Sequence, residues 1–205
     1  QRTLRAVFNH SWSLLDSDQQ AMFARLSIFS GGFTPAAAQA VADASPQGLA
    51  NLESKSLVKS VLSSPQTTTD GRPKALRYVS HASIHQYMFE VLQESPGLYS
   101  EMQERHSTYY RHKLRHHAHL LASEQALDAA NEIAADSQNI RRVWQRAVLS
   151  RDWQFIQEML EILAPYYQLR GFNREAENIY RNAINTLGIH AANNILTTVG
   201  SDAIR

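Results

Sequence analysis

Histidines crowd one predicted helix, at His106, His112, His116, His117 and His119. His112 and His116 are one helical turn apart and His119 follows three residues later, so three imidazole rings can share one face. Such spacing suits zinc, but a zinc site also needs an orienting carboxylate and usually a buried position. Cations that would repel a metal ion alternate with the histidines, at Arg111, Lys113 and Arg115. We therefore expect no metal site, but a solvated helix face whose charge rises below about pH 6.5.

A further histidine, His81, stands where a helix is predicted to begin, in Ser80-His81-Ala82-Ser83. An imidazole beside a helix N-terminus can favour a phosphate oxygen, because the exposed N–H groups and the helix dipole attract anions there. The same ring can instead bond to the first turn of its own helix. The residue types alone favour this capping role.

No catalytic motif accompanies these histidines. The sequence has no glycine-flanked serine of the nucleophile-elbow type and no glycine-rich phosphate loop ending in Lys-Ser or Lys-Thr. It contains no cysteine, which excludes disulfides, thiolate chemistry and cysteine zinc sites and is compatible with a reducing compartment. We therefore expect that this chain is not itself an enzyme, holds no cofactor and is cytoplasmic.

Composition excludes two classes of partner. The formal net charge of the 205 residues is +1, so no global field recruits nucleic acid or an anionic membrane. No apolar run approaches the roughly 18 residues of a membrane span, and no signal peptide is evident. Because the chain starts at Gln1 with a helical pattern already running by Leu4, we expect a piece of a longer protein.

The elements around His81 predict a small domain. Residues 57–62 and 76–79 are short strands, joined by a polar loop with an Asp70-Gly71 turn signal, and the helix after His81 runs to Leu92. Four short helices are predicted ahead of them, three with cap signals: a capping box from Ser17 to Gln20, Thr34-Pro35, and Ser45-Pro46. Helices followed by a strand, a wing loop and a strand predict a winged-helix domain at residues 1–92.

Everything after this domain is predicted to be helical. Pro96-Gly97 separates the exit helix from a long helix over 98–122, and a short one follows to Ala130, so residues 93–130 are connecting helices. From residue 131 the apolar spacing predicts helices joined by minimal connections, near 140–148, 153–167 and 176–187. Five aromatic residues lie on the apolar stripes of the first predicted helix and of these later helices. We expect them in the core, namely Trp12, Trp144, Trp153, Tyr166 and Tyr167. The fold class predicted is mainly α.

Two stretches resemble known families. The first is carried by Arg2-Thr3-Leu4-Arg5-Ala6, Ser11-Trp12-Ser13-Leu14-Leu15, residues 26–34 and 52–58, Arg77-Tyr78 and Ile84-His85-Gln86-Tyr87. Over about residues 2–125 it resembles the winged-helix segment of signal-transduction ATPases with numerous domains, the STAND class, in its bacterial transcriptional-regulator branch. The second, residues 166–184, resembles the turn and second helix of a tetratricopeptide repeat, with Gly171 at a close helix approach and Tyr180 in the large hydrophobic position. Residues 131–205 would then be a truncated array of such repeats.

The STAND resemblance implies a regulatory role. In that class an upstream P-loop domain binds ATP or ADP, and the winged helix folds over the nucleotide with a Met-His-Asp-like motif whose histidine touches the β-phosphate. Ser80-His81-Ala82 takes that place here, with the histidine kept and the Met and Asp positions changed. The implied partners are the upstream nucleotide-binding domain and a protein or small-molecule effector at the repeats.

Two other functions stay open on the sequence. A winged helix can bind DNA, but the helix near 35–44 has one glutamine and no basic residue, so only a weak backbone patch remains, at Arg72, Lys74 and Arg77. DNA binding through this chain is therefore not expected. A plain protein-interaction scaffold, with the winged helix as a spacer, is the second alternative.

Overall fold

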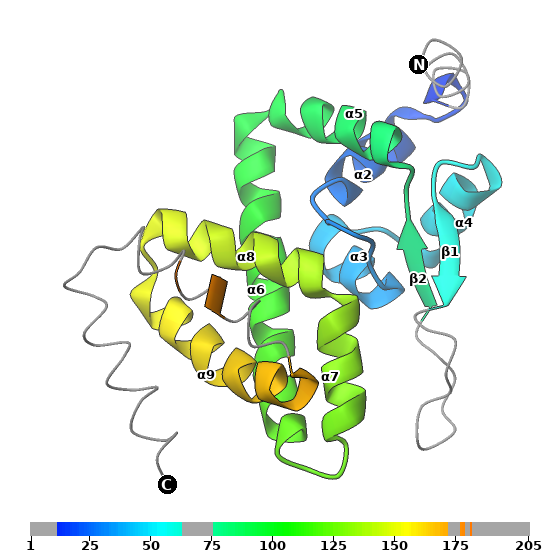
Figure 1. Cartoon of the computed structure of the whole chain (residues 1–205). Coiled ribbons are helices and arrows are strands. Elements are labelled where there is room, and N and C mark those ends of the chain that lie inside the picture. The colour runs from blue at the N-terminus through cyan, green and yellow to red at the C-terminus, as the bar shows by residue number, and fades with distance from the viewer. Residues whose placement is uncertain (1–11, 63–75, 172–176, 179–180, 182–205) are drawn as a thin grey trace, which may run out of the picture. The chain divides into compact units, whose positions relative to one another are not determined.

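The computed structural model describes residues 12–62, 76–171, 177, 178 and 181 of the chain (Figure 1). These residues are mainly helical, as predicted, with one two-stranded antiparallel sheet. The chain divides into two compact units, Gln1–Arg111 and His112–Arg205. The division falls inside one long helix, α6, which contributes its first part to unit 1 and its last part to unit 2.

The described residues of unit 1 form three short helices, two antiparallel strands and two further helices. Their bounds are α2 Ser17–Leu26, α3 Pro35–Ala42, α4 Pro46–Ser54, β1 Lys59–Leu62, β2 Leu76–Val79, α5 Ala82–Gln93 and the beginning of α6 Pro96–Leu121. This is the order of elements that the sequence predicts. The sequence predicts that Pro96 and Gly97 separate two helices. Both residues instead belong to the first turn of α6, and the prediction is correct only in that Pro96 marks a helix start.

Side-chain caps fix the starts of these helices. Thr34 Oγ1 accepts the Ala37 N–H at 3.1 Å, and Ser45 Oγ accepts the Gly48 N–H at 3.0 Å, as both Pro-containing signals predict. The predicted cap of α2 at Ser17 is wrong. Asp16 takes that position and its Oδ1 accepts the Gln19 N–H at 2.8 Å, because an ionised carboxylate is favoured at the positive end of the helix.

Strands β1 and β2 pair antiparallel, with Lys59 opposite Val79 and Leu62 opposite Leu76. Strand β2 has the predicted bounds, whereas β1 begins two residues later than predicted, after the buried Leu57 and Val58. Tyr78 of β2 also pairs with Phe33, which precedes α3, through backbone bonds of 3.0 and 2.8 Å. The turn before α3 is therefore joined to the hairpin by backbone pairing.

An aromatic cluster forms the centre of unit 1. The ring of Phe29 lies 4.8 Å from that of Phe33, 5.5 Å from His106 and 6.5 Å from Tyr110. All of these side chains are buried; Phe29 and Phe33 come from the connection between α2 and α3, and His106 and Tyr110 come from α6. Burial of large aromatic side chains is the strongest apolar contribution available to a small core.

One ion pair joins α6 to the end of α3 within unit 1. The guanidinium of Arg105 donates to both carboxylate oxygens of Asp43, at 2.6 and 2.5 Å, and to the Ala40 carbonyl at 3.1 Å. Asp43 has a φ of 55° and ends α3 in the left-handed conformation. The Arg105 hydrogen bonds hold the pKa of the Asp43 carboxyl below its usual value.

Replacing Arg105 with Gln is expected to lower the free energy of unfolding by about 1 kcal/mol at pH 7, because the pair is bidentate but partly exposed. A carboxyl whose pKa is lowered by folding stabilises the protein above its ordinary pKa and loses that effect as the pH falls. The Arg105→Gln variant should therefore lose less stability than the parent between pH 5 and pH 2.5 in urea titrations. An equal loss in both proteins would contradict the role of this pair.

Unit 2 contains the rest of α6 and the helices α7 Ala126–Ala135, α8 Ser137–Ser150 and α9 Trp153–Arg170. Helices α7, α8 and α9 contact one another pairwise (Figure 1). Trp144, Tyr166 and Tyr167 are buried, as predicted. Trp153 is 43% exposed, so its predicted core position is wrong: it starts α9 next to the turn at Arg151 rather than lying on the packed face.

Parts of the predicted organisation lie outside the described residues. They include most of the helix expected over 4–15, the loop 63–75 with Arg72 and Lys74, and the helix expected near 176–187 with Tyr180. Gly171 is described: it ends α9 with a φ of 67°, a left-handed cap that favours glycine. The divisions at residues 92 and 130 stay predictions.

Candidate functional site

His81 is the N-cap residue of α5, and one residue separates it from the end of β2. Its Nδ1 accepts the N–H of Ser83 at 3.3 Å, and its side chain is exposed. The bonding to its own helix start that the residue types favour is therefore present. No partner for its Nε2 is recorded among residues 12–62 and 76–171.

This cap bond determines which nitrogen of His81 carries the proton. Nδ1 can accept only when it is unprotonated, so in the neutral ring the proton lies on Nε2. The exposed edge of His81 is then a hydrogen-bond donor beside the first turn of a 12-residue helix. Capping the helix and donating to an oxyanion are compatible roles for the same ring.

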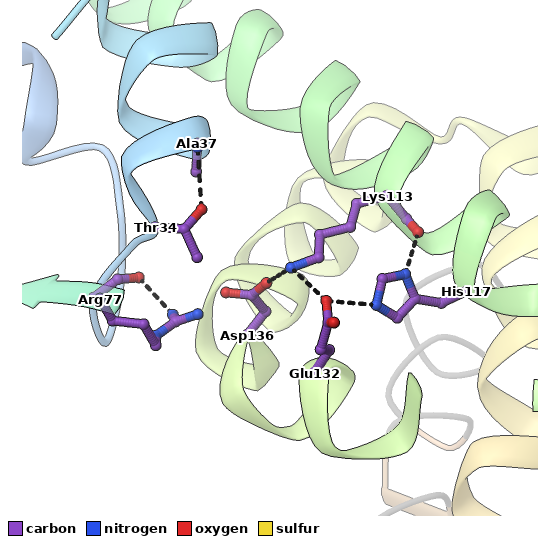
Figure 2. A network of polar contacts seen from close by, with 8 residues as sticks. Thr34, Ala37, Arg77, Lys113, His117, Glu132 and Asp136 are labelled. Carbon is purple, nitrogen blue, oxygen red and sulfur yellow. Dashed lines mark hydrogen bonds and ion pairs between the residues drawn. The ribbon is translucent and has the colours of Figure 1, made fainter. Parts of the chain in front are cut away.

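A second polar cluster lies in unit 2 and is buried in part. Lys113 Nζ on α6 lies 2.7 Å from Asp136 Oδ2 and 3.4 Å from Glu132 Oε2 (Figure 2). His117, one turn further along α6, places Nε2 3.0 Å from the same Glu132 oxygen and Nδ1 2.9 Å from the Lys113 carbonyl oxygen. We call Lys113, His117, Glu132 and Asp136 the α6–α7 cluster.

Burial within the α6–α7 cluster is uneven. The side chains of His117 and Asp136 are 4% and 3% exposed, and that of Lys113 is 21% exposed, whereas that of Glu132 is 56% exposed. The hydrogen bond from His117 and then the charge of Lys113 lower the pKa of Glu132 to about 2. Glu132 is therefore ionised at all ordinary pH values.

The histidines of α6 do not share one solvated face, so that prediction is wrong in part. His112, His116 and His119 are exposed, as expected. His106 is 2% exposed and lies against Phe29 and Tyr110, and His117 is 3% exposed in the cluster. The reason is that His106 and His117 lie on the buried side of α6, in the same helical stripe as Met102, Tyr110 and Leu114, whereas the three exposed histidines lie on the opposite side.

Two other cations that the sequence placed on the surface are bonded internally. Arg77 is 5% exposed, and its Nη2 donates to the Gly32 carbonyl at 3.0 Å, so it cannot belong to a basic patch beside the wing (Figure 2). Lys113, expected to repel a metal ion from a solvated face, instead compensates two carboxylates. Both corrections follow from tertiary neighbours that the sequence pattern does not specify.

Sequence reasoning missed the α6–α7 cluster, although one signal for it is present. Lys113 and His117 are four residues apart, as are Glu132 and Asp136, so each pair lies on one side of its helix. A basic pair and an acidic pair on consecutive helices joined by a short turn favour an antiparallel match. Recognising this match requires the correct bounds of α7. The helix extends from Ala126 to Ala135, whereas the sequence predicts that it ends near residue 130.

The described residues contain no group of three or more His, Cys, Asp or Glu side chains arranged to hold a metal ion. None of the helices in the described ranges is long and apolar enough to span a membrane. The fold is thus that of a mainly helical protein with a small antiparallel sheet in its first unit. No family model, no curated protein and no solved structure matches the chain.

Proposed function

We propose that this chain is a non-catalytic regulatory segment of a cytoplasmic STAND-type signalling ATPase that regulates transcription. In this proposal residues 1–92 are a winged helix that reports the nucleotide state of an upstream ATP- or ADP-binding domain. The helices after residue 131 are tetratricopeptide-like repeats that couple this state to a protein or small-molecule effector. Such a relay requires each input to bind one arrangement of the parts more tightly than the other.

The position of His81 is the observation that carries the proposal. It is separated from β2 by one residue, is exposed and caps α5 through Nδ1, which leaves Nε2 as the donor nitrogen of the neutral ring. This is the place of the histidine in the Met-His-Asp-like motif that the resemblance implies. A donor at a helix N-terminus has the chemistry to bind a phosphate oxygen.

The order of elements in unit 1 gives further support. In the described part of unit 1, three helices, two antiparallel strands and an exit helix follow one another as in a winged helix. The pairing of Phe33 with Tyr78 ties the turn before α3 to the second strand. His85 strengthens the exit helix, because its Nε2 donates to the Phe29 carbonyl at 2.6 Å.

The experiment restores the upstream domain and measures ADP affinity for the parent, His81→Ala and His81→Asn. Asn is an efficient N-cap, so the second variant keeps the helix start while it removes the imidazole. Loss of one charge-assisted hydrogen bond should weaken ADP binding about tenfold in both variants and raise the resting activity. The exposed His112→Asn substitution is the matched control and should bind ADP like the parent.

Unchanged ADP affinity and resting activity in His81→Asn would exclude the sensing role. A loss confined to His81→Ala would assign His81 to capping α5 alone. The His112→Asn variant must also bind ADP as tightly as the parent. If removing this other exposed histidine weakened ADP binding equally, the loss could not be assigned to the position of His81.

DNA binding is the first alternative, and the residues of unit 1 bear on it. Neither α3 nor α4 contains Lys or Arg, and Arg77 is buried. Sequence-reading helices need side chains such as Arg, Asn or Gln at base edges and cations on the phosphates. Tight duplex binding that weakens steeply with salt would favour this alternative over the relay. A scaffold without nucleotide coupling is the second alternative, and the His81 variants test it.

A further inference from the structure

Three exposed histidines lie on one side of the last part of α6. Neither His112, His116 nor His119 makes a hydrogen bond or ion pair within the described ranges of the chain. Successive residues of an α-helix are rotated by about 100° and rise by about 1.5 Å. His112 and His116 are therefore about 40° apart around the helix and about 6 Å apart along it. At this spacing two imidazole rings can turn toward one ion.

The same geometry limits how many of these rings can share an ion. His116 and His119 are also neighbours, about 60° apart around the helix, whereas His112 and His119 are about 10 Å apart along it. Nitrogen ligands lie only about 2 Å from a bound metal ion. All three rings therefore cannot reach one ion, and the described residues likewise contain no metal-ligating group of three or more side chains. The spacing allows a site with two protein ligands, and His116 belongs to either possible pair.

The cations that alternate with these histidines are engaged elsewhere. Lys113 Nζ lies 2.7 Å from Asp136 Oδ2, and Arg115 Nη2 donates to Glu158 Oε2 at 3.0 Å. A carboxylate in contact with a cation reduces the repulsion that the cation exerts on a metal ion nearby. The third cation, Arg111, is half-buried. Two of the three cations on which the expectation of no metal site rests are thus offset by carboxylates.

The sequence has one other pair of histidines four residues apart, His81 and His85 of α5, and both of those rings are hydrogen-bonded. His81 Nδ1 accepts the Ser83 N–H at 3.3 Å, and His85 Nε2 donates to the Phe29 carbonyl at 2.6 Å. A metal ion bound there would compete with these contacts, since each uses a ring nitrogen. The pair on α6 has no such competition, so the two pairs differ in their bonding and not in their spacing.

We propose that His112 and His116 form a two-histidine site for a divalent transition-metal ion, namely Cu²⁺, Ni²⁺ or Zn²⁺, with His119 as the alternative partner of His116. Imidazole is a preferred ligand of these ions, whereas Mg²⁺ and Ca²⁺ are held by oxygen ligands. Water occupies the remaining coordination positions of an ion on this exposed face. The inference does not depend on the proposed function.

The test titrates Ni²⁺ calorimetrically into the parent, His116→Gln and His112→Gln at pH 8, because imidazole binds a metal ion only when it is unprotonated. A second ligand on the same chain raises affinity by about a hundredfold or more, since it binds intramolecularly. His116→Gln breaks both possible pairs and should bind Ni²⁺ about a hundredfold more weakly than the parent. His112→Gln keeps His116 and His119 and should lose less.

His81→Asn is the matched control, because it removes one ring of the hydrogen-bonded pair with the same spacing. It should bind Ni²⁺ like the parent. Equal Ni²⁺ affinities of the parent and His116→Gln would overturn the proposal. A loss in His81→Asn as large as that in His116→Gln would also overturn it, because the ion would then be bound on α5. Mg²⁺ should give no binding at these positions.

A second measurement uses the parent alone. Cu²⁺ is paramagnetic and broadens the NMR signals of nuclei close to it. Substoichiometric Cu²⁺ should broaden the ring signals of His112 and His116 before those of His81 and His85. Equal broadening of all four rings at the same ratio of Cu²⁺ to protein would contradict the proposal, since it would indicate that single imidazoles bind the ion independently.

Discussion

Replacing Lys113 with Met is expected to lower the free energy of unfolding of unit 2 by about 3–5 kcal/mol at pH 7, the cost of removing one partner of a buried ion pair. Nζ of Lys113 lies 2.7 Å from Oδ2 of Asp136, whose side chain is only 3% exposed. Without the ammonium group the Asp136 carboxylate keeps its burial and loses the positive charge at 2.7 Å. Urea unfolding followed by tryptophan fluorescence measures this loss, since Trp144 and Trp153 both belong to unit 2.

A double variant identifies the cause. Lys113→Met, Asp136→Asn should recover part of the stability, because it removes the carboxylate charge together with its lysine partner and keeps an acceptor of similar shape. Lys59→Met, at an exposed position of β1, is the matched control and should change stability by no more than about 0.5 kcal/mol.

A double variant that recovers no stability would contradict this account and would assign the loss to the packing of the lysine stem. Equal effects of Lys113→Met and Lys59→Met would show that the cluster contributes nothing.

Local signals in the sequence predict helix starts well, because a cap involves residues only three apart. Thr34-Pro35 and Ser45-Pro46 each give a helix with the expected capping bond. The start of α2 shows the limit of such signals. Asp16 and Ser17 are adjacent and both can cap, and the residue chosen depends on where the preceding turn ends, which the cap sequence does not encode.

Charged residues were placed less well, because their surroundings are set by contacts distant in sequence. Arg77 is bonded to a carbonyl 45 residues away, and Lys113 to a carboxylate 23 residues away. The spacing of residues along one helix or strand predicts that such cations are exposed, because Lys and Arg usually lie at the surface. His81 was located correctly as a helix-start residue, because its capping bond spans only two residues. Its nucleotide role stays a prediction.

The turn before α3 offers a test of how unit 1 is held together. Gly32 has a φ of 101°, which side chains rarely adopt, and a Cβ added there would lie 2.8 Å from the Tyr78 carbonyl oxygen and 2.8 Å from Val79 Cγ1. The same Tyr78 carbonyl accepts the Phe33 N–H at 3.0 Å. Gly32 also offers its own carbonyl to Arg77. Backbone approach at this point therefore requires glycine for both conformation and space.

Gly32→Ala is accordingly expected to destabilise unit 1 by about 3 kcal/mol or more. The unfavourable φ alone costs about 1–3 kcal/mol, and displacement of β2 weakens two Phe33–Tyr78 backbone bonds at about 0.5–1.5 kcal/mol each. Gly97→Ala is the matched control, because nothing lies within 4 Å of an added Cβ among the described residues and alanine favours a helix. It should leave stability unchanged or raise it slightly in the same urea titration. If Gly32→Ala were as stable as Gly97→Ala, the pairing of Phe33 with β2 would not hold the α2–α3 turn against the sheet, and the support that this pairing gives to a winged helix would be lost.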